Sequence, residues 1–242
     1  FFLEKLPKRV LVVGGGYIAV EFAGIFNGLG SDVIQLYRGP HFLRGFDDDV
    51  RMVLADEMRK KGVDLRFNTN IARIEKTPDA YLAELEDGTE IETDLIMYAT
   101  GRDPKSRNIG LEAAGVDLAA NGAVKVDDYF KTSVDSIYAI GDVIDRVALT
   151  PVAIAEGMIL AGNLFKDQTR MADYEDIPTA VFSQPNIGTV GLTEAQARDK
   201  YGAVDIYTSS FKPMKHTLTG SDEKTFMKLI VDQASDRVVG FH

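Results

Sequence analysis

The sequence of 242 residues contains no cysteine and only three histidines. Without cysteine the chain cannot form a disulfide, bind a metal through thiolates or carry out thiol chemistry of its own. His41, His216 and His242 lie far apart in the sequence and form no pair with the spacing of metal ligands. A zinc site is therefore not expected.

Long apolar runs and excess positive charge are also missing. No apolar run reaches the roughly 18 residues that span a membrane, and the first ten residues lack the order of a secretory signal. The chain has 27 basic and 37 acidic residues, a net charge of −10, so its overall field repels nucleic acid and anionic membranes. With 45% hydrophobic residues it can bury a sizeable core. We expect a soluble, cytoplasmic, globular protein without nucleic-acid or membrane partners.

Both ends of the sequence lie next to or inside segments that resemble strands. The chain begins with two phenylalanines and stops at "RVVGFH". We therefore expect it to be a fragment of a longer protein.

The first part of the chain, residues 1–104, has the pattern of a βαβαβ unit. Apolar runs predict buried parallel strands, and helical periodicity fills the intervals between them. Asp47 is expected to cap the second helix, and Gly30 and Gly62 to end the two helices. The predicted strands are 9–13, 33–37 and 63–67, and the predicted helices are 17–29 and 47–61. A three-stranded meander is predicted at 71–76, 81–86 and 90–93. Residues 95–100 are predicted to return to the parallel sheet.

Two further blocks follow. Residues 105–175 predict a strand pair, 124–126 with 137–140, and a helix opening at "LTPVAIAEGMILAGNLF". Residues 176–242 alternate like strands. They predict strands within "TAVFSQPNIGTVGL" and at 205–211, 226–231 and 237–241, with one helix at 194–201.

The segment "VVGGGYIA" predicts a dinucleotide-binding turn. Gly14 permits a tight passage from strand to helix, Gly16 lets the backbone approach a pyrophosphate, and Ala19 stands where a third glycine would allow the closest packing. The N-terminus of the following helix offers a positive dipole and unpaired N–H groups to the phosphates. Its place between a predicted strand and a predicted helix supports this interpretation.

The second strand ends in Tyr37 and Arg38, where a carboxylate that binds the ribose 2′-OH of NADH is usual. Arg38 and Arg44 would instead make charge-assisted bonds to a 2′-phosphate. We therefore predict NADPH as the ligand; the alternative is that both arginines are solvated loop residues. Glu21 is either a charge on the helix face or a group that faces the cofactor and pairs with a lysine outside this chain.

The chain resembles the glutathione reductases, within the flavin-dependent disulfide reductases. The resemblance is carried in order by "VVGGGYIAVEFAGI", "YRGPHFLRGFD", "YATGRDP", "SIYAIGDV", "LTPVAIAEG" and "IPTAVFSQPNIGTVGLTE", and covers essentially the whole chain. It implies an α/β fold with a Rossmann-like NADPH domain carrying the meander (1–104), the second segment of a split FAD domain (105–175), and part of an α+β dimerisation domain (176–242).

The resemblance also implies roles for single residues. Tyr17 matches the tyrosine that covers the nicotinamide pocket, although an aromatic at a helix start is also explained by packing. Asp142 matches the carboxylate that bonds the ribityl and pyrophosphate region of FAD; its alternative role is helix capping. Thr150 begins a helix that matches the segment beneath the flavin, where a positive helix end stabilises the reduced ring.

Ala148 matches a backbone contact to nicotinamide, and Val181 matches a residue that borders the same pocket. Gly101 and Arg102 match the loop beside the NADPH site. The expected cofactor-binding residues are Gly14, Gly15, Gly16, Tyr17, Ile18, Glu21, Arg38, Arg44, Gly101, Arg102, Asp142, Ala148, Thr150 and Val181.

Two departures limit what the resemblance implies. The family reduces disulfides with a cysteine pair and with a histidine followed by proline, but this chain has no cysteine and nothing follows His242. No catalytic residue is therefore expected within it. Met158 stands where some glutathione reductases place an arginine that contacts the substrate carboxylate, and trypanothione reductases also lack that arginine.

We therefore expect a homodimeric enzyme in which NADPH reduces FAD, the flavin reduces a cysteine pair outside this chain, and the dithiol reduces glutathione disulfide. The alternatives are reduction of trypanothione or a related low-molecular-weight disulfide, and a non-catalytic nucleotide-binding and dimerisation module.

Overall fold

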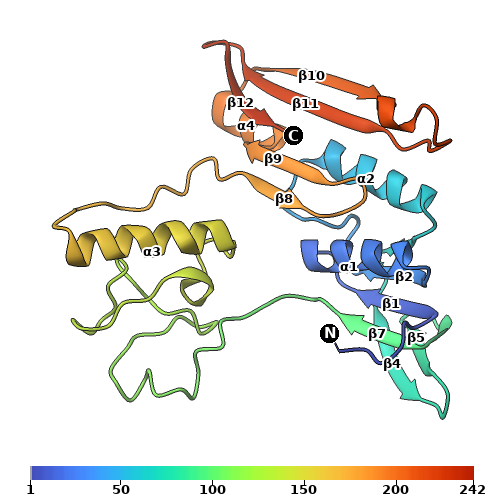
Figure 1. Cartoon of the computed structure of the whole chain (residues 1–242), viewed down its shortest axis with the longest axis horizontal. Coiled ribbons are helices and arrows are strands. Elements are labelled where there is room, and N and C mark those ends of the chain that lie inside the picture. The colour runs from blue at the N-terminus through green and yellow to red at the C-terminus, as the bar shows by residue number, and fades with distance from the viewer. Residues whose placement is uncertain (1) are drawn as a thin grey trace. The chain divides into compact units, whose positions relative to one another are not determined.

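The computed structural model describes residues 2–242, which form two compact units (Figure 1). Unit 1 combines the chain up to Gly101 with the segment from Asp176 to His242, and unit 2 is Arg102–Glu175. None of the helices in residues 2–242 has the length and apolarity to cross a membrane. The assignment of the three sequence blocks to NADPH, FAD and dimerisation domains stays a proposal.

A four-stranded parallel sheet forms the first half of unit 1. Its strands are β1 (Arg9–Val13), β2 (Asp32–Tyr37), β3 (Asp64–Phe67) and β7 (Leu95–Tyr98), in the order β3-β2-β1-β7. On one face, Val10 and Val12 of β1 pack in the same core as α1 (Tyr17–Gly28) and α2 (Asp48–Lys60). On the other, Leu11 and Val13 pack against the meander. Burial on both faces explains the continuous apolar run of β1.

The predicted meander is confirmed as an antiparallel sheet of β4 (Ile71–Lys76), β5 (Tyr81–Leu85) and β6 (Glu90–Thr93). Ala83 and Leu85 of β5 and Ile91 of β6 supply its buried side chains. Every second residue of β5 points inward, because side chains alternate between the two faces of a strand. The meander therefore covers the face of the parallel sheet that the helices leave free.

The second half of unit 1 is a five-stranded antiparallel sheet. Its order is β10-β11-β12-β9-β8, with α4 (Glu194–Tyr201) packed through Ala197 against Val204 and Ile230. Val181 and Ile187 of this sheet enter the core that surrounds α1 and α2. The two sheets of unit 1 thus share one core. The strands are β8 (Thr179–Val181), β9 (Ile187–Gly191), β10 (Val204–Phe211), β11 (Thr225–Asp232) and β12 (Arg237–Phe241), and a short helix, η2 (Met214–His216), follows β10.

Unit 2 contains α3 (Thr150–Phe165) and a short helix, η1 (Gly141–Ile144), around a core that includes Phe130 and Ile159. The predicted strand pair 124–126 with 137–140 is wrong. Val124 bridges Leu118, and Tyr138 bridges Lys131, as isolated contacts. Residues 124–126 and 137–140 lie in irregular backbone whose hydrogen bonds go to different neighbours, and their apolar side chains pack against the core of unit 2. Their apolar character therefore reflects core packing rather than a shared ladder.

A buried lysine joins α2 to the second sheet of unit 1. The Lys228 ammonium on β11 lies 2.9 Å from the carboxylate of Asp47, 2.6 Å from Asp49 and 2.7 Å from Glu194. Burial alone would lower the pKa of Lys228, but the three carboxylates raise it above its usual value. Burial alone would also raise the pKa of Asp47, but the Glu194 N–H and the Lys228 ammonium lower it.

We predict that Lys228→Met destabilises unit 1 by about 3 kcal/mol at neutral pH, because three carboxylates lose their counter-charge. The pKa values of Asp47 and Glu194 are lower in the folded protein than in the unfolded chain, where they are about 4. The two carboxylates therefore stabilise the fold at pH values above about 4, and this stabilisation is lost as the pH falls through their folded pKa values. The difference between wild type and variant should therefore shrink below pH 4. Urea unfolding from pH 3 to 8 measures it, and a pH-independent difference would contradict the ionic explanation.

Candidate functional site

The turn between β1 and α1 is shaped by glycine. Gly14 has φ +147°, and a β-carbon there would lie 2.2 Å from the carbonyl oxygen of Ala99, which follows β7. A β-carbon at Gly15 would lie 2.3 Å from the Tyr37 ring. At Gly16 a β-carbon would meet no atom within 4 Å among the described residues other than its immediate neighbours in the chain. Gly14 and Gly15 are therefore required by the fold, whereas the space beside Gly16 is open.

The turn lies where the order of the sheet reverses. Strands β2 and β3 extend from one side of β1, and β7 pairs with its other side. Crevices at the carboxyl ends of strands at such a point are the usual ligand sites of doubly wound sheets. Gly101, three residues after β7, has φ +142°. A β-carbon added at Gly101 would have no described neighbour within 4 Å, so this edge of the sheet is also open.

The first turn of α1 has backbone N–H groups that no side chain caps and that an anion could bind. Gly16 is its N-cap, no side chain caps it, and its first turn contains no acidic residue. Tyr17 is partly exposed at the helix start, Ile18 is half-buried, and Ala19 is fully buried. The helix dipole and the unpaired N–H groups there favour a phosphate.

Arg38 and Arg44 lie in the loop between β2 and α2, which we call the arginine loop (residues 38–47). Both side chains are exposed, and within residues 2–242 neither guanidinium makes a hydrogen bond or ion pair. The loop is tied to the glycine turn, because the Leu43 N–H donates to the Gly15 carbonyl at 2.6 Å. Two uncommitted cations therefore stand on a loop that is fixed to the turn.

Glu21 and Val181 have partners inside unit 1. The Glu21 carboxylate accepts a hydrogen bond from the N–H of Phe182 at 2.9 Å, so it links α1 to the residue after β8. The two roles proposed for Glu21 from the sequence did not include this contact. The side chain of Val181 is fully buried, which leaves only its backbone to border a ligand.

The remaining predicted residues belong to unit 2. Arg102 pairs with Asp142 at 3.1 Å, with both side chains largely exposed. Asp142 lies in the first turn of η1, but no side chain caps that helix, so the capping alternative lacks support. Ala148 and Thr150 are exposed at the start of α3, which has proline in its first turn, no acidic residue there and no side-chain cap. This helix end is also free to stabilise negative charge.

Glu156 organises this part of unit 2 and was not among the predicted site residues. Its carboxylate is buried and accepts hydrogen bonds from the Gly141 N–H at 2.6 Å and from the Tyr174 hydroxyl at 2.7 Å. Burial, aided by the Glu156 carboxylate, raises the pKa of Tyr174. A charged residue within the apolar helix segment "VAIAEGMIL" was the available signal.

Gln35 was also missed. It is buried on β2 and donates from Nε2 to the Gly14 carbonyl at 3.1 Å. Its Oε1 has no partner among the described residues. A glutamine inside the apolar strand "VIQLY" was a visible signal. Its side chain supports the glycine turn by its hydrogen bond to the Gly14 carbonyl.

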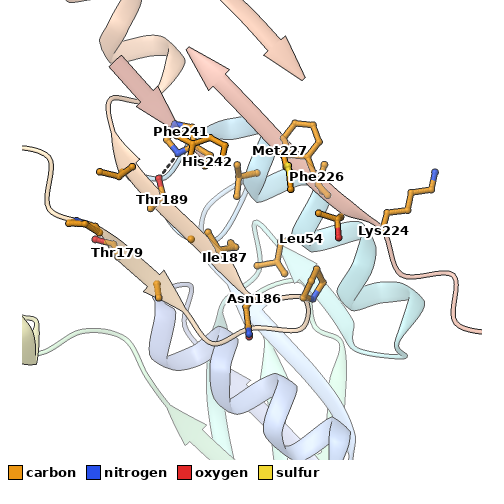
Figure 2. A pocket seen from close by; sticks show the side chains of 18 residues that line it. Leu54, Thr179, Asn186, Ile187, Thr189, Lys224, Phe226, Met227, Phe241 and His242 are labelled. Atoms are coloured by element: carbon orange, nitrogen blue, oxygen red, sulfur yellow. Dashed lines mark hydrogen bonds between the residues drawn. The ribbon is translucent and has the colours of Figure 1, made fainter. Parts of the chain in front are cut away.

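An apolar cavity of about 560 Å³ lies elsewhere in unit 1, between α2 and the second sheet (Figure 2). Leu54 and Ile187 line it, together with Thr189 and His242, which hydrogen-bond to each other. None of the predicted cofactor residues lines this cavity. Since its wall contains few charged groups, it is a poor candidate for a dinucleotide site.

The parallel sheet, the glycine turn and the uncapped start of α1 define a Rossmann-like α/β protein with an anion-accepting cradle. Residues 1–157 match the family model described as pyridine nucleotide-disulphide oxidoreductase, and residues 177–242 match that family's dimerisation domain. The chain belongs to this family.

Three relatives illustrate the similarity. The chain is 51% identical to a glutathione reductase from Burkholderia cepacia, covering 100% of this chain and 54% of that protein. It is 48% identical to a trypanothione reductase from Leishmania donovani, and the match covers 100% of this chain and 50% of that protein. The solved structure of the HOCl-induced flavoprotein disulfide reductase RclA from Escherichia coli superposes on this chain with a TM-score of 0.91 at 30% identity. The match covers 99% of this chain and 55% of that one. The chain spans about half the length of these relatives.

We predict that Gly14→Ala destabilises unit 1 by roughly 2 kcal/mol or more, because the methyl group meets the Ala99 carbonyl and the backbone has positive φ. Gly16→Ala should cost only about 0.5 kcal/mol, the modest penalty of alanine at an N-cap. Urea unfolding of both variants tests this, and equal losses would mean that the turn is not shaped as described.

Proposed function

We propose that this chain supplies the NADPH site, one segment of the FAD site and part of the dimer interface of a homodimeric reductase of glutathione disulfide. The observation that carries the proposal is the unpaired state of Arg38 and Arg44 beside a helix start that has neither cap nor acid. The chain's identity of about one half to glutathione reductases supports the same function.

The cradle suits NADPH better than NADH. The pyrophosphate would rest on the first turn of α1, where Gly16 leaves space for it. The 2′-phosphate needs cations, and the arginine loop offers two that no carboxylate neutralises. Tyr17 stands exposed at the start of the same helix, where an aromatic ring can cover a nicotinamide.

The residues of unit 2 fit a flavin in the same way. The exposed start of α3 at Thr150 would place a positive helix end against a reduced ring, and the Asp142 carboxylate would accept hydrogen bonds from sugar-like hydroxyl groups. Bound FAD and NADPH supply the hydride and electron transfer that protein side chains cannot provide. The residues of this chain bind and orient the two cofactors.

The disulfide substrate is the least determined part of the proposal. Met158 on α3 is 70% exposed and offers no cation to a glutathione carboxylate. The similar identity to a trypanothione reductase makes that larger disulfide the second candidate. Steady-state assays of the enzyme of which this chain forms part, with glutathione disulfide and with trypanothione disulfide, decide between them by the ratio of kcat/KM.

We expect the isolated chain to show no NADPH-driven disulfide reduction, even with added FAD, because it contains no cysteine to pass electrons to a disulfide. Turnover of purified chain above the buffer rate, followed by NADPH absorbance, would refute this. The same preparation should hold flavin weakly, since only one segment of the proposed FAD site is present.

The assignment of NADPH as the cofactor predicts that an Arg38→Gln, Arg44→Gln double variant loses affinity for NADPH but not for NADH. NADPH binding should weaken by about 3 kcal/mol, since each charge-assisted bond contributes roughly 1.5 kcal/mol at an exposed position. NADH binding should barely change, because NADH has no 2′-phosphate. An Arg73→Gln, Lys76→Gln double variant, which removes two exposed cations from β4 of the meander, is the charge-matched control. Calorimetric titration with both cofactors measures the difference, and equal losses would mean that the arginines only hold the loop.

A further inference from the structure

The arginine loop is fixed by backbone contacts rather than by its arginines. Phe42 and Leu43 are buried in the core of unit 1, and the Leu43 N–H binds the Gly15 carbonyl. Arg51 on α2 donates from Nε to the Phe42 carbonyl at 2.7 Å and from Nη2 to the His41 carbonyl at 2.8 Å. Since the side chains of Arg38 and Arg44 have no polar partners within residues 2–242, the course of the loop backbone determines where their guanidinium groups lie.

The last residue of the loop, Asp47, is its most heavily bonded point. Its carboxylate is 1% exposed and accepts hydrogen bonds from the Asp49 N–H at 3.1 Å, the Lys228 ammonium at 2.9 Å and the Glu194 N–H at 2.9 Å. The donors belong to α2, β11 and α4. One carboxylate therefore joins the loop and its helix to two elements of the second sheet.

Lys228 is held as firmly as Asp47. Its side chain is 2% exposed, and its three ammonium protons face three carboxylates, those of Asp47, Asp49 and Glu194. A cavity of about 460 Å³, lined by several charged residues, borders this cluster, and the side chains of Asp49 and Glu194 are 40% and 29% exposed while that of Asp47 is buried. Any displacement of β11 or α4 would move the buried Asp47 and, through it, the end of the loop three residues after Arg44.

We propose that Asp47 and Lys228 are positioning residues for cofactor selectivity. They hold the arginine loop so that Arg44 faces the 2′-phosphate of a cofactor whose pyrophosphate lies on the glycine turn. They also make this position depend on the second sheet, which lies in the segment that matches a dimerisation domain. The inference rests on the proposed binding of NADPH. It assigns a role in selectivity to two residues that do not touch the cofactor.

Asp47→Asn tests the inference, because positioning and simple electrostatics predict opposite results. Removing a carboxylate near the loop would strengthen binding of a phosphate if only the electric field mattered. The asparagine can keep the cap to Asp49, but its amide cannot satisfy both Lys228 and the Glu194 N–H. We expect NADPH binding about ten-fold weaker, the size of one charge-assisted bond, with NADH binding unchanged.

Asp56→Asn is the matched control, because it removes the same charge from an exposed pair on α2 without touching the loop. Lys228→Arg is the second variant: it keeps the charge among the three carboxylates but moves the Asp47 contact, and should also lower NADPH binding selectively. In an Arg44→Gln background, Asp47→Asn should have little further effect on NADPH. Retained NADH binding shows that each variant keeps its glycine turn.

The outcomes separate this inference from the proposed function. An unchanged or higher ratio of NADPH to NADH affinity in Asp47→Asn would overturn the positioning role, and so would full additivity with Arg44→Gln. Equal losses for both cofactors would assign Asp47 to general stability and overturn the selectivity role. A wild-type chain that binds both cofactors equally would overturn the NADPH assignment itself.

Discussion

The ion pair between Asp47 and Lys228 is the contact on which the arrangement of unit 1 depends. Burying two charges is costly, and the cost is offset only where the remaining hydrogen-bonding groups are also satisfied. Here Asp47 receives three donors and Lys228 faces three carboxylates. The same carboxylate begins α2, ends the arginine loop and receives the first N–H of α4. The position of the second sheet against the first is therefore specified by polar contacts as well as by the shared apolar core.

The four α-helices differ in how they begin, and the difference agrees with the proposed sites. The start of α2 is capped by Asp47, and α4 begins with a capping box between Thr193 and Gln196. The starts of α1 and α3 have no side-chain cap and no acidic residue in the first turn. A cap would occupy the N–H groups that a phosphate or a reduced flavin needs. The lack of a capping side chain costs α1 only a few tenths of a kcal/mol, because its N-cap is Gly16, and costs α3 about 1 kcal/mol, because its N-cap is Leu149.

Local features of this fold could be predicted from sequence, and long-range partners could not. The βαβαβ pattern, the meander, the 194–201 helix and the Asp47 cap all follow from periodicity and capping within a few residues. The prediction of a strand pair in unit 2 was wrong because apolar residues that pack against a core from irregular backbone have the same pattern as short strands. At the candidate site, the glycines and arginines were visible as a motif. Lys228 lies 181 positions from Asp47, so its role depends on the packing of two sheets that no local pattern encodes.

A second contact joins the proposed cofactor helix to the second sheet. Glu21 on α1 binds the N–H of Phe182, just after β8, while the neighbouring Val181 is buried in the core around α1 and α2. Together with the Asp47 and Lys228 pair, this contact bonds the second sheet to α1, which follows the glycine turn, and to α2, which follows the arginine loop. Both parts of the proposed cofactor site, the start of α1 and the arginine loop, are therefore next to elements that are bonded to the second sheet. The glycine turn and the segment that matches a dimerisation domain are therefore joined by polar contacts at two points, and under the proposed binding of NADPH both help to set the geometry that distinguishes a 2′-phosphate from a hydroxyl group.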